Sequence, residues 1–484
     1  MKKALLSLAL ALLATTVVSP SSSAATAGKL DRGFGRNGRV TIALPVHEQE
    51  LAYPQKPRAA RMAMDVLPGG GFAAANNRFV IERRQNGSAL RSFGENGKLA
   101  LVPPVGWKFE LADLAVDEEG RVLVAGTFAS LTTSAIQDPP QYNEGREAHG
   151  PRLRMGVVTR FLPDGALDPG FGTGGSVYGD FRQSPPTGPG PYDFEYGLPA
   201  VGLTGLALPP NGGIVLTGYS AEHVTGGCAP PLTGATGRSF IARLRSDGSF
   251  ESGFGSNGVI TLPGVERPSP PVLSPAGGIA FDGASGYCWP RGPEETGRLF
   301  ALQDNGQLDP SFGSAGARPH SSLQKVTALA FDSRGRLLLL GRRPETAELE
   351  GGIGNPEWRV RRLFADGRPD PTFGRNGSSS PSLPPQAHME DLAIDGHGRI
   401  SLAGFRTDAW GMNTRFLVTR LSGSGRREPR FGQNGWVVTR FPGTEAAAIA
   451  LKVTGRDRLL VGGIMGDPRF EESRGLAFAR LSGR

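Results

Sequence analysis

Short apolar runs recur along the chain, and each is bounded by Gly, Asp or Pro. Examples are VTIAL from Val40, LAVD from Leu114 and VLVAG from Val122. Runs of this kind, rich in β-branched residues and leucine, are typical of strands joined by tight turns. No helical periodicity continues long enough to compete with them. The pattern therefore predicts an all-β fold.

An internal repeat organises these runs. An F-G-x-x-G motif occurs seven times, at a base spacing of about 60 residues with insertions in two units. Each unit contains four strand-like runs, which predicts the four antiparallel strands of a β-propeller blade. We interpret the DG-x-LDPxFG segment that carries the motif as a connector between blades. The motif phenylalanines are Phe34, Phe93, Phe171, Phe254, Phe312, Phe373 and Phe431.

The two ends of the repeat region complement each other. The first unit starts partway through, at LDRGFGRNGRVTIAL, and the last stops partway through, at LAFARLSGR. Six whole units and one split unit predict a seven-bladed β-propeller whose last blade is closed by the N-terminal strand. We expect residues 38–44 to pair with residues 476–482, which would remove both free sheet edges. An open solenoid, the alternative, would need polar caps at its ends.

Several units match a known repeat pattern in detail. LDPGFGTGG, LDPSFGSAG and PDPTFGRNG precede hairpins such as DSRGRLLLLG and DGHGRISLAG. These pieces resemble the bacterial delta-60 repeat family, and the resemblance covers nearly all of residues 29–484. It implies a propeller in exported bacterial proteins and no particular reaction. The unit ALRSFGENG departs most from the pattern, and the insertions have no counterpart in it.

The N-terminus has the features of a cleavable signal peptide. Lys2 and Lys3 precede an apolar stretch from Ala4 to Val18, and Ala25 and Ala27 supply an A-x-A cleavage site. The stretch is too short to span a bilayer, and no cysteine lies nearby for lipid attachment. We therefore expect residues 1–27 to be removed and residues 28–484 to form a single propeller domain. That domain is expected to be secreted or periplasmic, monomeric and without a membrane span.

Composition narrows the possible partners. The 71 Gly and 40 Pro exclude a long coiled coil, and two Cys exclude a disulfide-dense scaffold or a four-cysteine zinc site. The formal net charge of +8 falls to +6 without Lys2 and Lys3. An exported basic protein could attract anionic envelope polymers. The alternative is an arginine-rich composition with no such partner, and nucleic acid is not expected outside the cytoplasm.

Two sets of repeated polar residues stand in register. Arginines end the fourth strand of five units, and carboxylates stand three residues before six of the motif phenylalanines. We expect an arginine–carboxylate clamp within the fold; a ring of cationic binding sites is the alternative. Likewise the phenylalanines are expected in the core rather than in a ligand-stacking ladder. The sets are Arg160, Arg243, Arg362, Arg420 and Arg480, and Asp31, Asp168, Glu251, Asp309, Asp370 and Glu428.

Two units break this pairing. One has Glu82 and Leu90 at the two positions, and another has Ala301 but keeps Asp309.

The insertions mark a candidate binding face. Residues 127–153 and 219–238 are read as strand 3–4 loops and residues 182–199 as a strand 1–2 loop, all on one face. Aromatic loop residues suit stacking on carbohydrate or peptide, whereas ordinary loop packing is the alternative. Cys228 and Cys288 are expected to form a disulfide between adjacent loops, or else to be two free thiols. The candidate aromatics are Tyr142, His149, Tyr192, Tyr196, Tyr219, His223, Tyr287, Trp289 and Trp410.

No catalytic, cofactor or metal motif is evident. The sequence therefore favours an exported binding or scaffold protein for an envelope glycan or a protein partner. One alternative is a hydrolase or lyase acting on polysaccharide, and another is a structural adhesin or matrix component. The enzyme would have to draw on Glu144, Glu147, His149, Asp193, Glu195 and His223.

Overall fold

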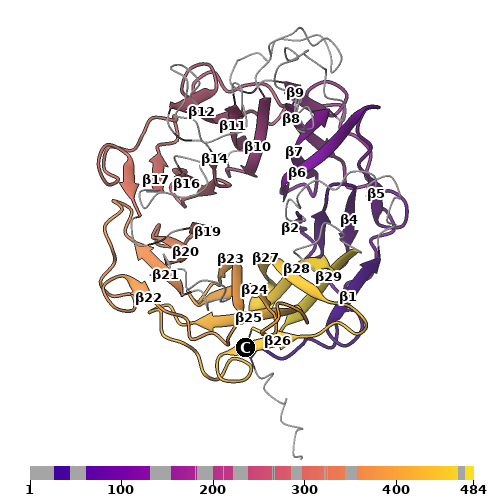
Figure 1. Cartoon of the computed structure of the whole chain (residues 1–484). Helices are drawn as coiled ribbons and strands as arrows, with labels where there is room; N and C mark the ends of the chain where they lie inside the picture. Colours follow the sequence, from indigo (N-terminus) through magenta and orange to yellow (C-terminus); the bar gives the residue numbers. More distant parts are fainter. Residues whose placement is uncertain are drawn as a thin grey trace, which may run out of the picture.

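A computed structural model describes most of the chain as a ring of seven antiparallel sheets (Figure 1). The described residues are 27–43, 61–130, 154–179, 181, 200–210, 212–221, 238–263, 265, 267–284, 297–320, 323, 325–343, 357–466 and 475–483. The seven-bladed all-β propeller expected from the repeat is confirmed. Among the described residues, no helix is long and apolar enough to cross a membrane.

The first four sheets are numbered as blades in chain order. Blade 1 consists of β2 (Ala63–Val66), β3 (Phe72–Ala75), β4 (Phe79–Arg83) and β5 (Lys98–Ala100). Blade 2 consists of β6 (Trp107–Val116), β7 (Val122–Ser130), β8 (Arg154–Phe161) and β9 (Ser176–Gly179). Blade 3 consists of β10 (Ala200–Ala207), β11 (Ile214–Ala221), β12 (Arg238–Leu244) and β13 (Val259–Pro263). Blade 4 consists of β14 (Arg267–Pro268), β15 (Val272–Leu273), β16 (Ile279–Ala284), β17 (Arg298–Leu302) and β18 (Ala317–Pro319).

The other three blades complete the ring. Blade 5 consists of β19 (Lys325–Phe331), β20 (Leu337–Arg342), β21 (Trp358–Leu363) and β22 (Ser378–Ser379). Blade 6 consists of β23 (Ala387–Ile394), β24 (Ile400–Arg406), β25 (Arg415–Leu421) and β26 (Trp436–Thr439). Blade 7 consists of β27 (Ala446–Thr454), β28 (Arg458–Met465), β29 (Gly475–Leu481) and β1 (Arg39–Ala43), with a short 3₁₀ turn η3 (Gly455–Asp457).

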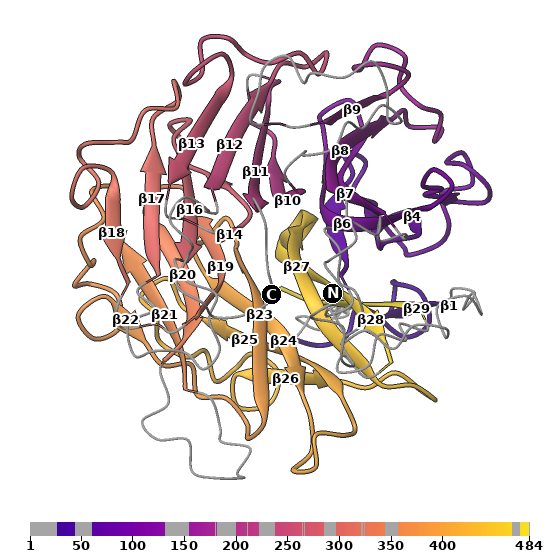
Figure 2. The ribbon, with the colours of Figure 1, turned by 45° about the horizontal axis from the view of Figure 1, so that its top comes forward.

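Each blade begins at the axis of the ring and ends at its rim. The first strands, such as β2, β6 and β23, surround the centre, and the fourth strands, such as β9, β22 and β26, lie outside (Figures 1 and 2). In blade 4 the first strand is split into β14 and β15, which both pair with β16. Pro270 and Pro271 lie between the two pieces, and proline has no N–H to give to a sheet.

The repeated motif lies within a blade, which corrects the interpretation of its segment as a connector between blades. In blade 2, β8 ends at Phe161, the motif contains Phe171, and β9 begins at Ser176. β9 then pairs back onto β8, with Val177 opposite Val158. The strand after each motif is therefore the outer strand of the blade just completed. The repeat unit has the length of a blade, but its phase is shifted by one strand.

The N-terminal strand closes the ring, as expected. β1 pairs antiparallel with β29, from Arg39 opposite Ala479 to Ala43 opposite Gly475 (Figure 1). The turn before β1 is also shared between the two ends of the chain. The Gly28 N–H donates to the Ser482 carbonyl over 2.8 Å, and the Ser482 N–H donates to the Lys29 carbonyl over 2.8 Å.

One backbone hydrogen bond repeats at all seven boundaries between blades. In every motif, the N–H of the glycine after the phenylalanine donates to a turn carbonyl of the next blade, with N···O distances of 2.7–3.0 Å. At the boundary between blades 6 and 7, the acceptor is Ala27 of the N-terminal segment. The seven bonds are Gly35 to Asn86, Gly94 to Asp164, Gly172 to Asp247, Gly255 to Asn305, Gly313 to Asp366, Gly374 to Ser424 and Gly432 to Ala27.

The core lies between neighbouring blades and is built around the motif phenylalanines, which are all buried. Phe34 of blade 7, for example, packs with Phe72 of blade 1 and Phe478 of blade 7. A glycine in the facing turn gives five of the seven rings their space. Gly425 has a φ of +81°, and a Cβ added there would lie 2.8 Å from Cε2 of Phe373. This contact explains why most of these turns carry glycine.

This packing predicts that Gly425→Ala destabilises the fold more than a glycine substitution that meets only backbone strain. Gly398→Ala is the matched control, because Gly398 has a φ of +76° but no atom within 4 Å of an added Cβ. We expect Gly425→Ala to cost roughly 1–3 kcal/mol more than Gly398→Ala. Denaturant unfolding of both variants measures the difference. Equal losses would show that the contact between blades does not matter.

Candidate functional site

The five repeated arginines lie against the repeated carboxylates, which stand eight positions later in four of the pairs. The Nε–carboxylate oxygen distances are 2.8 Å for Arg160–Asp168, 3.1 Å for Arg243–Glu251, 2.9 Å for Arg362–Asp370, 2.6 Å for Arg420–Glu428 and 2.9 Å for Arg480–Asp31. The last pair joins the two ends of the chain. The arginine side chains are only 3–6% exposed. They therefore present little guanidinium surface to a ligand.

Each of these arginines makes two further contacts. Its guanidinium lies over the motif phenylalanine, at 4.6 Å from the ring centre for both Arg420–Phe431 and Arg362–Phe373. Its Nη1 also donates to a backbone carbonyl of the next blade, as from Arg420 to Gly483 over 2.6 Å. Arg160, Arg243, Arg362 and Arg480 have the same kind of acceptor, namely Ser246, Asp304, Gly423 and Gln85. The clamp therefore connects adjacent blades as well as one strand to its turn.

Blade 1 replaces this arginine with a carboxyl group. Glu82 is buried, and its Oε1 has no hydrogen-bond partner within the described part of the chain. Burial raises the pKa of Glu82 to about 8, so the side chain is mostly neutral at pH 7. In blade 4, Ala301 leaves Asp309 without an arginine eight positions before it, and the Asp309 carboxylate accepts from the N–H and hydroxyl of Ser311.

Only two of the candidate aromatics on the insertion-bearing face are described. Tyr219 does not lie in a loop but in β11, paired with Gly202 on one side and Ser239 on the other, because that strand extends to Ala221. Its ring lies over Gly202, where an added Cβ would meet Cζ at 2.7 Å. Tyr219 is therefore a packing residue of the sheet.

Trp410 does lie in a loop, between β24 and β25, and it is 79% exposed. The Asp408 carboxylate organises this loop by accepting the N–H groups of Trp410 (3.0 Å) and Met412 (2.8 Å). The Asn413 side chain donates to the other Asp408 oxygen over 2.6 Å, and the Asn413 N–H donates to Glu445 over 2.9 Å. Hydrogen bonds within this loop and to Glu445 thus hold a large aromatic ring in an exposed position.

The remaining predictions for this face fall outside the described residues. They concern Tyr142, His149, Tyr192, Tyr196, His223, Tyr287 and Trp289, the disulfide candidates Cys228 and Cys288, and the acidic residues Glu144, Glu147, Asp193 and Glu195.

Four charged side chains converge at the axis, from the first strands of four consecutive blades. Lys452 of β27 lies 3.2 Å from Asp65 of β2, measured from Nζ to Oδ1. Asp391 of β23 and Asp113 of β6 interact electrostatically with the same lysine. Burial opposes the charge of Lys452, but the three carboxylates outweigh it and raise its pKa.

The axial carboxylates are engaged in holding neighbouring strands. Asp113 accepts from the Leu114 N–H at 2.8 Å and from Leu206 of the next blade at 3.2 Å. Asp391 does the same with Leu392 at 2.7 Å and Leu451 at 2.7 Å. Burial raises the pKa of Asp113 to about 6, although these bonds and Lys452 lower it. The cluster is therefore a structural brace with its own counter-ion.

A possible metal-binding group occurs where the turns of blades 6 and 7 meet. Within the described residues, Asp395, His397 and Asp457 are the group whose ligand atoms all lie within 4.8 Å of one another. Arg399 already stands among them, with Nε 2.6 Å from Asp395 and Nη2 3.3 Å from Asp457. His397 Nδ1 lies 3.1 Å from Asp457. These contacts form an ion-pair network in which Arg399 supplies the positive charge.

Comparison with known proteins agrees with the fold. Residues 351–373 match a family described as a domain of unknown function (DUF5122) beta-propeller. This is consistent with a propeller repeat protein. No curated protein is similar enough in sequence to match the chain.

Solved structures that resemble the chain are distant. The polysaccharide lyase Uly1 is 9% identical with a TM-score of 0.46, over 87% of this chain and 90% of that one. The Neurospora crassa Pan2 WD40 domain is 10% identical with a TM-score of 0.41, over 92% and 94%. The Fusarium graminearum α-L-arabinofuranosidase Arb93A is 10% identical with a TM-score of 0.40, over 75% and 93%. No activity is carried over from them.

Sequence reasoning missed the axial cluster and the bonds between blades. Backbone carbonyl acceptors leave no trace in the sequence, so the Nη1 contacts could not be anticipated. The axial cluster does leave a trace in the sequence, because Lys452 occupies the register of Ala115 in blade 2 and Ala393 in blade 6. A lysine at a position that holds alanine in four of the other blades indicates a local charge requirement.

The clamp geometry predicts that Arg420→Gln lowers thermal stability. The substitution leaves the Glu428 carboxylate without its cation and removes the bond to the Gly483 carbonyl. We expect a loss of roughly 3 kcal/mol, as for other broken buried ion pairs. Arg426→Gln, at an exposed position in the following turn, is the control and should change stability little. Unchanged stability together with lost ligand binding would instead support the ring of cationic sites.

Glu82→Gln tests the buried carboxyl of blade 1. Because the folded pKa is raised from 4.5 to about 8, the folded protein holds this proton over a range in which the unfolded chain releases it. The stability that neutral Glu82 contributes is complete below about pH 4.5 and is lost progressively as the pH rises to about 8. The glutamine variant should therefore become more stable than the wild type across this window, by at most about 5 kcal/mol.

Denaturant unfolding at pH 5, 7 and 8.5 measures that difference. Glu95→Gln is the control, because Glu95 is exposed in the same blade. Parallel pH profiles for wild type and Glu82→Gln would contradict the assignment.

Proposed function

We propose that this protein is an exported propeller of the delta-60 repeat type that acts as a binding module for polysaccharide of the cell envelope or its surroundings. The proposed location, secreted or periplasmic, rests on the signal-like segment at residues 1–27. Cleavage after Ala27 would keep Gly28, Lys29 and Asp31, which make the closing contacts with β29 and the turn after it. It would remove the carbonyl that accepts from Gly432 and the Ala27 side chain, which packs against the core of blades 6 and 7.

The Trp410 loop is the observation that carries the proposal. An indole ring exposed on a bonded loop loses little conformational freedom when it stacks on a sugar ring, so such a residue is well suited to binding. Trp410 lies between the second and third strands of blade 6, on the face of the ring where connectors between blades such as residues 101–106 also lie. Met412 beside it is half exposed and extends the apolar surface.

The axial charges support binding rather than catalysis. A general acid or base needs an oxygen that can reach the substrate. In Asp113 and Asp391 both oxygens accept backbone N–H groups, and Asp65 is paired with Lys452 and accepts from the Val116 N–H at 3.0 Å. The polysaccharide hydrolase or lyase considered from the sequence would depend on the loop residues outside the described part.

Trp410→Ala should abolish or weaken carbohydrate binding. A panel of soluble neutral and acidic polysaccharides, titrated against residues 28–484, should contain one that binds saturably and changes tryptophan fluorescence. We expect the dissociation constant to rise roughly tenfold in Trp410→Ala, the equivalent of one lost stacking contact. Trp410→Phe should retain much of the affinity.

The control is Val105→Ala, which removes another exposed apolar side chain from the same face. Equal losses in both variants would indicate non-specific adhesion. Absence of saturable binding to any polysaccharide would favour the scaffold or adhesin role.

A further inference from the structure

The boundary between blades 4 and 5 differs from the other boundaries at several register positions. Leu299 of β17 packs with Leu337 and Leu363 of blade 5. Arg318 of β18 pairs with Leu299, so its side chain leaves the sheet on the same side, toward blade 5. Ala301 lies on this side too, two positions beyond Leu299, so no clamp arginine crosses this boundary.

Arg318 stands where five of the other blades have an apolar residue. The equivalent positions, two residues after the last motif glycine, hold Val40, Leu99, Val177, Ile260 and Val437, and blade 5 has Ser379. Some of these side chains lie against the turn of the following blade: an added Cβ on Gly248, for instance, would meet Val177 Cγ2 at 2.6 Å. At the corresponding turn of blade 5, the three atoms nearest to a Cβ added on Gly367 belong to Phe312 and none to Arg318.

Blade 5 contributes more arginines to the same boundary. The clamp residue Arg362 reaches toward blade 6, so its neighbour Arg361 projects to the other side of β21, toward blade 4, as does Arg359. Arg359 occupies the register of Val157, Phe240 and Leu417, which are all buried apolar residues. This boundary thus keeps its apolar cluster but has gained positively charged side chains beside it.

The guanidinium groups of Arg318 and Arg359 are only partly paired within the described part of the chain. Burial, together with the nearby charge of Arg318, lowers the pKa of Arg361. Glu357 pairs with both Arg343 (3.0 Å) and Arg359, but the Nε of Arg359 remains buried without a partner. Within the described part of the chain, Arg318 makes no hydrogen bond or ion pair.

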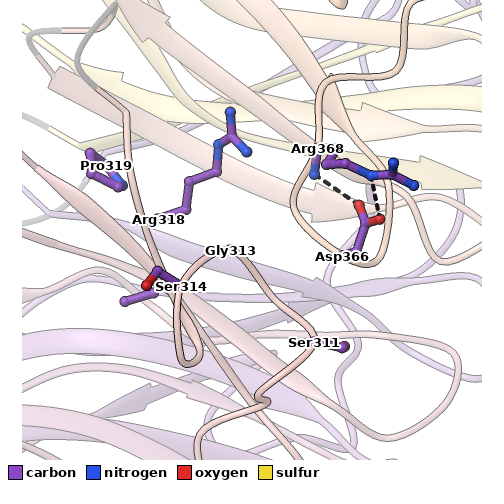
Figure 3. Close-up of a pocket in the computed structure, with 8 residues that line it drawn as sticks. Ser311, Gly313, Ser314, Arg318, Pro319, Asp366 and Arg368 are labelled. Atoms are coloured by element: carbon purple, nitrogen blue, oxygen red, sulfur yellow. Dashed lines mark hydrogen bonds and ion pairs between the residues drawn. The ribbon is translucent and has the colours of Figure 1, made fainter.

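Two shallow hollows lie along this boundary. One has a volume of about 420 Å³ and is lined by Arg318 and Pro319 of β18, by the loop before β18, and by Asp366 and Arg368 of blade 5. Figure 3 shows Arg318 extending into it, while Arg368 is held by Asp366 over 2.6 Å. The second has a volume of about 260 Å³ and is lined by Leu323, Arg343, Arg359, Arg361 and Ser378.

We propose that the two hollows at the boundary between blades 4 and 5 bind the oxyanion groups of an acidic polysaccharide, through Arg318 in one hollow and Arg361 in the other. Guanidinium groups recognise carboxylates and sulfates through paired N–H donors. Two arginine-lined hollows at one boundary suit a polymer with repeated charges rather than a single ion. The site is independent of the Trp410 loop, because it uses different residues in different blades.

Calorimetric titration with oligogalacturonate, a carboxylate polymer, and with inorganic sulfate tests this site at constant ionic strength. We expect saturable binding of oligogalacturonate and weaker binding of sulfate. Arg318→Val should raise the dissociation constant for oligogalacturonate at least tenfold without lowering thermal stability, because valine is the residue of other blades at this position. Arg361→Thr, which copies Thr419 of blade 6, should have a similar effect.

Arg298→Gln is the matched control and should bind like the wild type. Arg298 is exposed on β17 but pairs with Pro319, so it projects from the opposite side of the sheet. Equal losses in Arg298→Gln and Arg318→Val, or no loss in Arg318→Val, would overturn the proposal. Displacement of oligogalacturonate by an oligonucleotide of equal charge would overturn the assignment to polysaccharide. Trp410→Ala should leave the binding of oligogalacturonate unchanged. A failure of the present proposal can therefore be distinguished from a failure of the Trp410 proposal.

Discussion

The ring depends on one backbone hydrogen bond that recurs at every boundary, from the motif glycine of one blade to a turn carbonyl of the next. Because donor and acceptor are main-chain groups, the bond survives changes of side chain on either blade. What it requires is a positive-φ turn and room for the motif phenylalanine, and at five boundaries the glycine that faces the phenylalanine supplies both. At the final boundary the acceptor is Ala27, the last residue of the proposed signal segment, so after cleavage that boundary would rely on β1 and on the bonds of Gly28 and Lys29 to Ser482.

The arginine clamp is a second layer on this frame. It adds a charge-assisted bond, a cation–π contact and a bond to the next blade at five boundaries, yet blades 1 and 4 are built without it. Glu82 in blade 1 keeps the position buried but neutral. Ala301 in blade 4 has no long side chain at this position. Arg318 and the arginines of β21 face the same boundary instead. The frame thus tolerates local replacement of the clamp.

Periodicity and turn residues were sufficient to predict the architecture, because blade number and ring closure follow from the repeat and its split ends. They did not reveal the blade boundaries, since the repeat is continuous and only the pairing of β9 back onto β8 shows which blade the strand after a motif joins. The pairs such as Arg160 and Asp168 were visible as coincident positions in several units. Tyr219 was predicted to lie in a loop, because the end of a long strand and the start of a loop look alike in the sequence when an insertion follows directly.

Departures from the repeat separate into two kinds once the contacts are known. Lys452 stands where four other blades have alanine, but Asp65, Asp113 and Asp391 surround it, so its charge is balanced within the fold. Arg318 stands where three blades have valine, and within the described part of the chain it makes no hydrogen bond or ion pair, although Asp366 interacts with it electrostatically. A repeat protein holds its blades with equivalent atoms, so an arginine at a boundary that bonds to neither blade contributes little to stability. It is the position at which a ligand of opposite charge would supply what the fold does not.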